Sequence, residues 1–327
     1  RDLSFDETEE PMSEEFWNEL RPDSLLPREL EVIEMVDSIQ SSSNYKIING
    51  LISTLTLGYI PIGPFEFGKV FNMYSTNDVE GSRFSLGITT SRKTKRNFRP
   101  VIYAAYGAGD TNWKYGVEAL WIQRRQPRRE WFFKHSRDID QLGMSTYFEQ
   151  GNLMNSILTP STDTVQLALI TQSELKYSGD FGSGFNSSLS LRHIEIEPQD
   201  PSSILYPTHP SFETTLQLMY QKNLKFISGA YRRVGLGNRS PRYTFMVTKA
   251  WPNILESMYS YGRYTMEASW ISRHGPLGRI EWNIDGGTYS GVAPYTLLEF
   301  QPANESWMSV INGFNQIKYM EFISDTW

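Results

Sequence analysis

The side chains that could do chemistry are few and scattered along this 327-residue chain. It contains no Cys, and its four histidines, His135, His193, His209 and His274, do not form a pair at metal-binding spacing. A zinc site needs convergent ligands, and no serine stands in the Gly-x-Ser-x-Gly turn of the α/β-hydrolases. We therefore expect no metal site, no cofactor and no catalytic residues, so that the protein is not an enzyme.

The densest group of polar residues is the segment Asn77-Asp78-Val79-Glu80-Gly81-Ser82-Arg83. It stands where a loop leads into a segment of alternating polarity, so its acidic and basic side chains can meet at a strand end. We take Asn77, Asp78, Glu80, Gly81 and Arg83 as a candidate motif of a barrel lumen. The alternative is a purely structural one, in which these charges make a salt-bridged strand start.

A second candidate is the basic run around Gln126-Pro127, in which Arg124, Arg125, Arg128 and Arg129 gather at the expected tip of a hairpin. Arginine forms bidentate hydrogen bonds with phosphate, and basic clusters bind anionic lipid headgroups. These four arginines are therefore candidates for contact with outer-membrane lipid or lipopolysaccharide. The alternative is a solvated turn whose charge prevents aggregation at a sheet edge.

The elements that must position these residues are strands, because polarity alternates with a period of two from Tyr45 onward. In one segment, for example, Trp113, Tyr115 and Val117 alternate with Lys114 and Gly116. Such segments are expected at 47–60, 64–74, 80–91, 99–108, 112–124, 129–137, 164–178, 184–197, 210–221, 242–251, 262–273, 278–289 and 315–326. Most are about 9–13 residues long, which suits a tilted strand that crosses a membrane.

Composition favours the same conclusion. Mean hydropathy is low, at −0.44, yet aromatic residues make up 14% of the chain. A polar average with many Tyr and Trp is typical of a membrane barrel, whose strands alternate between lipid and a wet lumen. No apolar stretch reaches about 18 residues, so no transmembrane helix is expected, and the net charge of −6 argues against a nucleic-acid partner.

We therefore predict an all-β fold, an antiparallel transmembrane β-barrel of twelve or more strands with a short N-terminal helical lead-in. Residues 1–44 are the expected helical or irregular periplasmic lead-in, with Pro27 opening a helix at its first turn. Residues 45–327 are the expected outer-membrane barrel. A large soluble β-sandwich is the alternative, because its strands also alternate.

A set of short motifs, in this order along the chain, resembles a known family. The motifs are Tyr59-Ile60-Pro61-Ile62-Gly63, the 77–84 segment, Tyr103-Ala104-Ala105-Tyr106-Gly107, Asp138-Ile139-Asp140-Gln141-Leu142-Gly143, Gly275-Pro276-Leu277-Gly278 and Pro294-Tyr295-Thr296-Leu297-Leu298. The family is the uncharacterised outer-membrane β-barrel family of Bacteroidota-type bacteria, whose members carry an N-terminal carboxypeptidase-like regulatory domain. That domain is absent from this sequence, and the resemblance implies a barrel that continues beyond Trp327.

The expected function follows from fold and resemblance together: an outer-membrane β-barrel protein of a Gram-negative bacterium that acts in surface assembly, translocation or transport. Its expected partners are outer-membrane lipid or lipopolysaccharide and other outer-membrane proteins in a complex. Two alternatives stay open, a non-transporting scaffold subunit of a larger outer-membrane complex and a soluble β-rich binding protein.

Overall fold

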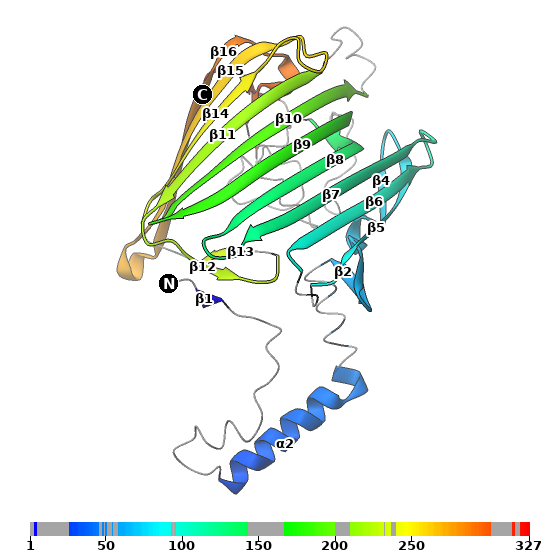
Figure 1. Ribbon diagram of the computed structural model, residues 1–327, viewed down its shortest axis with the longest axis vertical. Coiled ribbons are helices and arrows are strands. Elements are labelled where there is room, and N and C mark those ends of the chain that lie inside the picture. Colours follow the sequence, from blue (N-terminus) through cyan, green and yellow to red (C-terminus); the bar gives the residue numbers. More distant parts are fainter. Residues whose placement is uncertain are drawn as a thin grey trace.

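One long antiparallel sheet dominates the structure (Figure 1). The computed structural model of the chain describes residues 3–4, 26–45, 48, 50, 54, 58–92, 94, 96–142, 167–199, 210–231, 233–236, 240–301, 316–317 and 321–327. The sheet has thirteen strands in the order β16-β15-β14-β11-β10-β9-β8-β7-β6-β5-β3-β2, and β4 pairs with β5 beside β3. Their bounds are β2 Tyr59–Ile62, β3 Phe65–Gly68, β4 Tyr74–Asn77, β5 Gly81–Thr90, β6 Phe98–Gly107, β7 Trp113–Arg124, β8 Arg129–Gln141, β9 Leu167–Gly182, β10 Phe185–Pro198, β11 Ser211–Gln221, β14 Arg242–Ala250, β15 Ser260–Arg273 and β16 Arg279–Val292.

The remaining elements are short. Strands β12 (Lys225–Ser228) and β13 (Arg233–Leu236) form a hairpin between β11 and β14, and β1 (Leu3–Ser4) pairs in parallel with β12. Strands β17 (Glu299–Phe300) and β18 (Ile323–Ser324) form a separate pair. Single-turn helices are η1 (Val70–Asn72), η4 (Gly275–Leu277) and η5 (Tyr295–Leu297).

The longest helix among the described residues, α2 (Pro27–Ser41), begins where the sequence predicts, with Pro27 in the first turn. The Glu29 side chain closes this end by accepting a hydrogen bond from the Leu26 backbone N–H at 2.9 Å. Side chains of α2 with described burial are all exposed, including Val32 and Ile39. The short helix expected around residues 13–20 lies outside the described residues.

The predicted all-β, antiparallel class is confirmed, and most strands lie where the alternation places them: β5 to β11 and β14 to β16 each overlap one expected segment. The prediction was wrong for 64–74, where a long strand was expected. This stretch instead holds β3, a single helical turn and the start of β4. Gly68, with a φ of 148°, ends β3, because this backbone conformation is open mainly to glycine.

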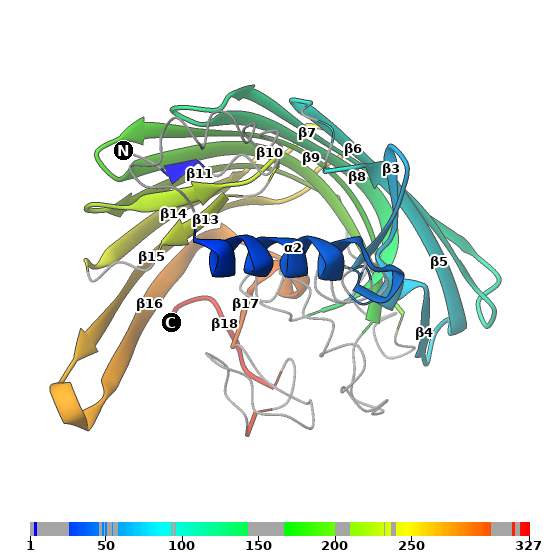
Figure 2. The same cartoon turned by 90° about the horizontal axis from the view of Figure 1, so that it is seen from below.

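The two faces of the sheet differ sharply in polarity. The sheet curves strongly, with one convex and one concave face (Figure 2). Cross-strand partners share a face, and the register joins Ile102 to Val117, Phe133 to Leu175, and Leu216 to Val247. Exposed members of this apolar face include Phe84, Leu86, Ile102, Val117, Phe133, Leu175, Leu191, Leu216, Phe245, Met266 and Ile284. The intervening residues give the other face most of its charged and polar side chains, together with a small apolar cluster of Leu142, Ala168, Ile194 and Ile196 that packs against Leu297 of η5.

The sheet does not close on itself within the described residues, because β2 and β16 stand at opposite ends of the strand order. Asp325 and Trp327 hydrogen-bond to Tyr289 and Gly287 of β16 along the edge that β15 leaves free. The closed barrel predicted from the sequence is therefore not observed, whereas the open antiparallel sheet is.

Gly116 of β7 lets an aromatic ring lie against the concave face. A Cβ at this position would meet Tyr103 Cε1 at 2.2 Å and Cζ at 2.7 Å. The ring cannot simply move away, because its hydroxyl donates a hydrogen bond to Asp138 Oδ2 at 2.8 Å. This is one position where the absence of a side chain decides how neighbouring strands pack.

Replacement Gly116→Ala should therefore lower the free energy of unfolding by about 1–3 kcal/mol, the usual cost of overpacking. The measurement is urea unfolding of the purified protein, followed by tryptophan fluorescence. Gly235→Ala is the matched control, because its Cβ would lie 3.7 Å from the nearest neighbouring atom, Leu224 Cδ1. Equal unfolding midpoints for wild type and Gly116→Ala would contradict this packing.

Candidate functional site

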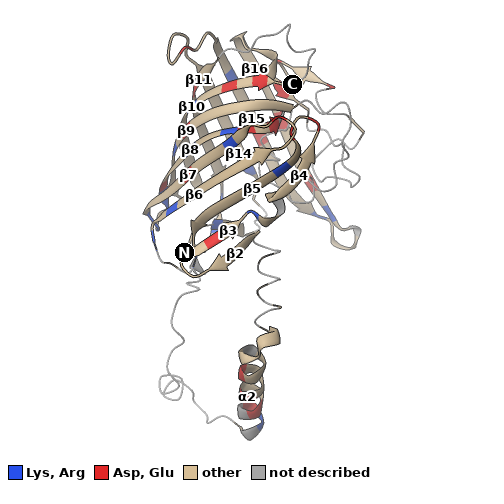
Figure 3. Ribbon diagram, turned by 90° about the vertical axis from the view of Figure 1, so that its right-hand side faces the viewer, with Lys and Arg blue, Asp and Glu red and all other residues tan. Residues whose placement is uncertain are grey.

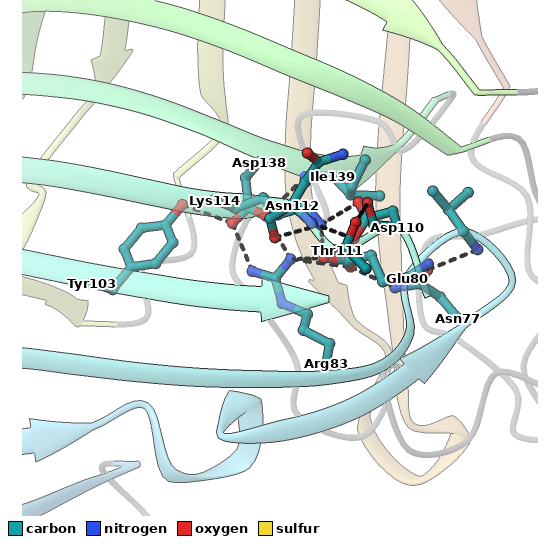
Figure 4. A network of polar contacts seen from close by, with 11 residues as sticks. Asn77, Glu80, Arg83, Tyr103, Asp110, Thr111, Asn112, Lys114, Asp138 and Ile139 are labelled. Carbon is teal, nitrogen blue, oxygen red and sulfur yellow. Dashed lines mark hydrogen bonds and ion pairs between the residues drawn. The ribbon is translucent and has the colours of Figure 1, made fainter. Parts of the chain in front are cut away.

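The first charged cluster lies at the turn between β4 and β5, and we call it the turn network (Asn77, Glu80, Arg83, Lys114 and Asp138; Figure 4). Glu80 is at its centre and only 1% exposed. Its carboxylate accepts hydrogen bonds from Asn77 Nδ2 at 2.7 Å and Arg83 Nη1 at 2.9 Å, and pairs with Lys114 Nζ at 2.8 Å. Lys114 is equally buried, so the two charges compensate each other away from solvent.

Arg83 links this centre to β8. Its guanidinium forms a bidentate pair with Asp138, with Nη1–Oδ1 at 2.7 Å and Nη2–Oδ2 at 2.9 Å. Tyr103 donates a third hydrogen bond to the same carboxylate. A bidentate arginine pair fixes distance and orientation together, so the network ties the β4–β5 turn to β6, β7 and β8.

The local sequence explains the shape of the turn. Asn77 Oδ1 accepts hydrogen bonds from the backbone N–H groups of Val79 and Glu80, which is how Asn favours turns. Gly81 follows with a φ of 60°. A Cβ on Gly107 would lie 2.9 Å from both Glu80 Cβ and Lys114 Nζ, so this glycine leaves room for the buried pair.

The protonation state of Glu80 follows from its neighbours. Burial alone would raise its pKa, but the hydrogen bonds from Lys114 and Asn77 and the charge of Arg83 outweigh burial and hold the pKa below its ordinary value. The carboxylate is therefore charged at neutral pH. Each of its oxygens already has hydrogen-bond or ion-pair partners, so this arrangement fits a structural clamp better than a general acid or base.

A second cluster crosses the concave face, and we call it the charge ladder (Glu118, Lys134, Glu174, Arg192 and Glu213). These residues are successive cross-strand partners on β7, β8, β9, β10 and β11, and their charges alternate. Figure 3 shows that acidic and basic positions lie on neighbouring strands of the sheet. Opposite charges that face each other across strands are favourable. At one end, Arg192 Nη2 lies 2.6 Å from Glu213 Oε2, and Tyr261 donates a hydrogen bond to Glu213.

The structure brings three of the five predicted motif residues into one contact network: Asn77, Glu80 and Arg83. Gly81 shapes the turn, and Asp78 is exposed beside it. Sequence reasoning missed Lys114 and Asp138, which follow Arg83 by 31 and 55 residues and meet it only through strand register. Their one sequence signal is charge at inward-facing positions of alternating segments.

The four arginines at the β7–β8 tip do not behave alike. Arg128 is buried, with Nε 2.7 Å from Glu130 Oε2 and Nη2 donating to the Tyr231 carbonyl at 2.7 Å. Its guanidinium therefore already has two partners within the protein. Arg124 and Arg125 are exposed, and the Arg129 guanidinium lies 5.9 Å from the Phe181 ring centroid.

Ser187, His193 and Asp285 have the side-chain types of a Ser-His-Asp triad, but the structure does not bring them together. Ser187 and His193 lie six residues apart on β10, and the His193 ring bonds instead to the Leu255 carbonyl. Asp285 is on β16, at the end of the sheet. Within the described ranges, no group of three or more His, Asp or Glu side chains could hold a metal ion. Nor does any helix there have both the length and the apolar character to cross a membrane.

The fold and these clusters define a class: an all-β chain with one curved antiparallel sheet and a charged concave face. Residues 182–322, from the β9–β10 turn to β17 and beyond, match the model of the C-terminal domain of DUF5686, a family of unknown function. A search of curated proteins finds no match.

Replacement Glu80→Gln should lower the free energy of unfolding at pH 7 by about 3 kcal/mol, because it leaves Lys114 and Arg83 buried with less opposite charge. Because the folded pKa is depressed, the contribution of Glu80 is complete above the unfolded pKa of about 4.3. It is lost as pH falls through the folded value. The gap between variant and wild type should therefore narrow below about pH 4 in urea titrations.

The matched control is Asp78→Asn, which removes an exposed acid from the same turn. It should change stability by no more than about 0.5 kcal/mol. A pH-independent effect of Glu80→Gln, or one equal to that of Asp78→Asn, would rule out the buried ion pair as its cause.

Proposed function

We propose that the chain forms the wall of a membrane-spanning β-barrel in the outer membrane of a Gram-negative bacterium, and that it acts in surface assembly, translocation or transport. The observation that carries the proposal is the separation of polarity between the two faces of the sheet. Among the described residues the apolar convex face is exposed, and it is backed by a charged concave face, which is what lipid outside and water inside require.

The extent of the convex face argues against a soluble protein. Large apolar side chains are exposed on every strand from β5 to β11 and from β14 to β16. Soluble monomers rarely expose a continuous apolar patch of more than a few hundred Å². A hydrocarbon environment removes that cost, because apolar side chains then contact acyl chains instead of water.

Aromatic residues form a row near one end of the strands, as expected at a membrane interface. Trp131 packs on Tyr177 with ring centroids 4.8 Å apart, and Trp270 stacks on Trp282 at 5.5 Å. Both pairs lie toward the strand ends that join through the β7–β8, β9–β10 and β15–β16 turns. Tyr106 and Trp113 form a pair at the opposite end.

The charged concave face favours a function as a conduit or an assembly platform, rather than as an inert scaffold. The charge ladder runs across five neighbouring strands, and ionisable residues inside a membrane protein usually face its interior or a water-filled cavity. In this proposal the charge ladder lines a lumen and catalyses no reaction. Other outer-membrane proteins are the expected partners. The four arginines Arg124, Arg125, Arg128 and Arg129 are the candidates for contact with lipopolysaccharide, and Arg124 and Arg125 are the exposed ones.

The proposal carries a requirement at the sheet edges. Unpaired backbone N–H and C=O groups in hydrocarbon cost several kcal/mol each. The free edges of β2 and β16 must therefore be paired in the membrane, by strands of the same polypeptide or of a partner protein. If a partner protein supplies the strands that close the barrel, the chain functions as one subunit of a complex.

Cell fractionation tests the location, and conductance tests the function. The protein should fractionate with outer membranes, resist carbonate extraction and show heat-modifiable gel migration. Conductance in a planar bilayer would favour transport, whereas no conductance with a constant co-purifying partner would favour the scaffold alternative. Recovery of the protein from the periplasm without detergent would contradict the membrane location and favour the alternative of a soluble β-rich binding protein.

Replacement Val117→Arg should impair membrane insertion, because Val117 lies on the convex face. An arginine facing lipid near the midplane costs about 2–4 kcal/mol. The readout is the yield of folded, heat-modifiable protein in outer membranes. Met246→Arg is the matched control, since Met246 pairs across strands with the polar residues Gln217 and Thr265 on the concave face. Equal yields for the two variants would contradict the assignment of the faces.

A further inference from the structure

A cavity of about 330 Å³, lined mostly by residues with polar side chains, lies between the concave face and the β12–β13 hairpin. Its floor comes from inward-facing residues of β8 to β11, and its roof from Phe226, Tyr231 and Arg233. This volume is at the lower end of the roughly 300–1,000 Å³ found for small-molecule sites. The cavity is separate from the turn network and from the charge ladder, none of whose residues line it.

The roof is held in place by residues that the ligand would not need to displace. Arg128 donates to the Tyr231 carbonyl, and Arg233 pairs with Asp180 at 2.9 Å. The Tyr231 hydroxyl also donates to the Thr94 carbonyl at 3.2 Å. These contacts anchor the loop around the hairpin against β5–β6, β8 and β9, so the cavity is a preformed feature of the fold.

The charges around the cavity are balanced with one exception. Arg128 pairs with Glu130 at 2.7 Å, and Arg233 pairs with Asp180. Lys176 on β9 also lines the cavity, and its side chain forms no ion pair or hydrogen bond within the described part of the chain. The cavity therefore offers one uncompensated positive charge.

Uncharged polar groups supply the rest of the lining. Asn186 Nδ2 is buried without a hydrogen-bond partner among the described residues. Such an orphaned donor costs about 1–3 kcal/mol, which a ligand acceptor would recover. Ser178, Ser188 and Gln217 stand beside it, and Met219 adds an apolar wall.

We propose that this cavity binds a monosaccharide-sized polyol that carries a single negative charge, a sugar acid in chemical class. Lys176 pairs with the carboxylate, while Asn186 and the neighbouring hydroxyl and amide groups bond to the ligand hydroxyls. Glu130 and Asp180 disfavour an anion of higher charge, because they would repel it. This inference concerns the cavity alone and does not depend on membrane location.

The test is calorimetric titration of the purified, folded full chain with D-glucuronate, D-glucose and inorganic phosphate as probes. Glucuronate should bind at one saturable site, and glucose and phosphate should each bind about tenfold more weakly, since one charge-assisted hydrogen bond is worth about a factor of ten. Lys176→Met should weaken glucuronate binding about tenfold and leave glucose binding unchanged. Absence of saturable glucuronate binding at millimolar concentration, or tighter binding of phosphate, would overturn the proposal.

Two further variants separate binding from folding and from general electrostatics. Asn186→Ala loses no hydrogen bond of the Nδ2 atom in the free protein, so it should not lower the unfolding midpoint but should weaken glucuronate binding severalfold. Lys225→Met removes an exposed positive charge from the hairpin without changing the lining, and it should bind glucuronate as wild type does. If Lys225→Met weakens binding as much as Lys176→Met, the attraction is a property of the local field and the proposed site is wrong.

Discussion

The structure depends on one constraint: every residue of a strand must face one of the two sides of a single curved sheet. Successive side chains of a strand point to opposite faces, so a single shift in register would exchange the environments of all of them. The ten long strands from β5 to β16 pair in a register that keeps the two sets of side chains on opposite faces of the sheet. Apolar side chains thereby gather on the convex face and charges on the concave one.

Burial of charge on the concave face is managed by pairing. Glu80 and Lys114 are each about 1% exposed, and Glu213 is as deeply buried against Arg192. An unpaired charge in such a place would be strongly destabilising. The two clusters differ in what they join: the turn network connects a loop to three strands, whereas the charge ladder connects neighbouring strands at one level of the sheet.

Much of the fold could be predicted from the sequence because a period of two is a local signal. The segment expected at 112–124 became β7, Trp113–Arg124, and the one at 210–221 became β11, Ser211–Gln221. The sequence could not predict which side chains meet across strands, since that depends on register and curvature. Arg83 was singled out from its neighbours in sequence, whereas its bidentate partner Asp138 is 55 residues away. The cavity under β12 and β13 was beyond prediction for the same reason, because its roof and floor belong to different parts of the chain.

The segment between β11 and β14 also has a mechanical role. Tyr231 reaches Thr94, 137 residues earlier, and Arg125 donates to the Ala230 carbonyl across 105 residues. Along the sheet, β11 and β6 are five strand spacings apart, roughly 24 Å of arc at about 4.8 Å per spacing. The segment spans the concave side directly, from one end of that arc to the other. Its length therefore helps to set the radius of the sheet, and a change in strand tilt must be accompanied by a change in the hairpin.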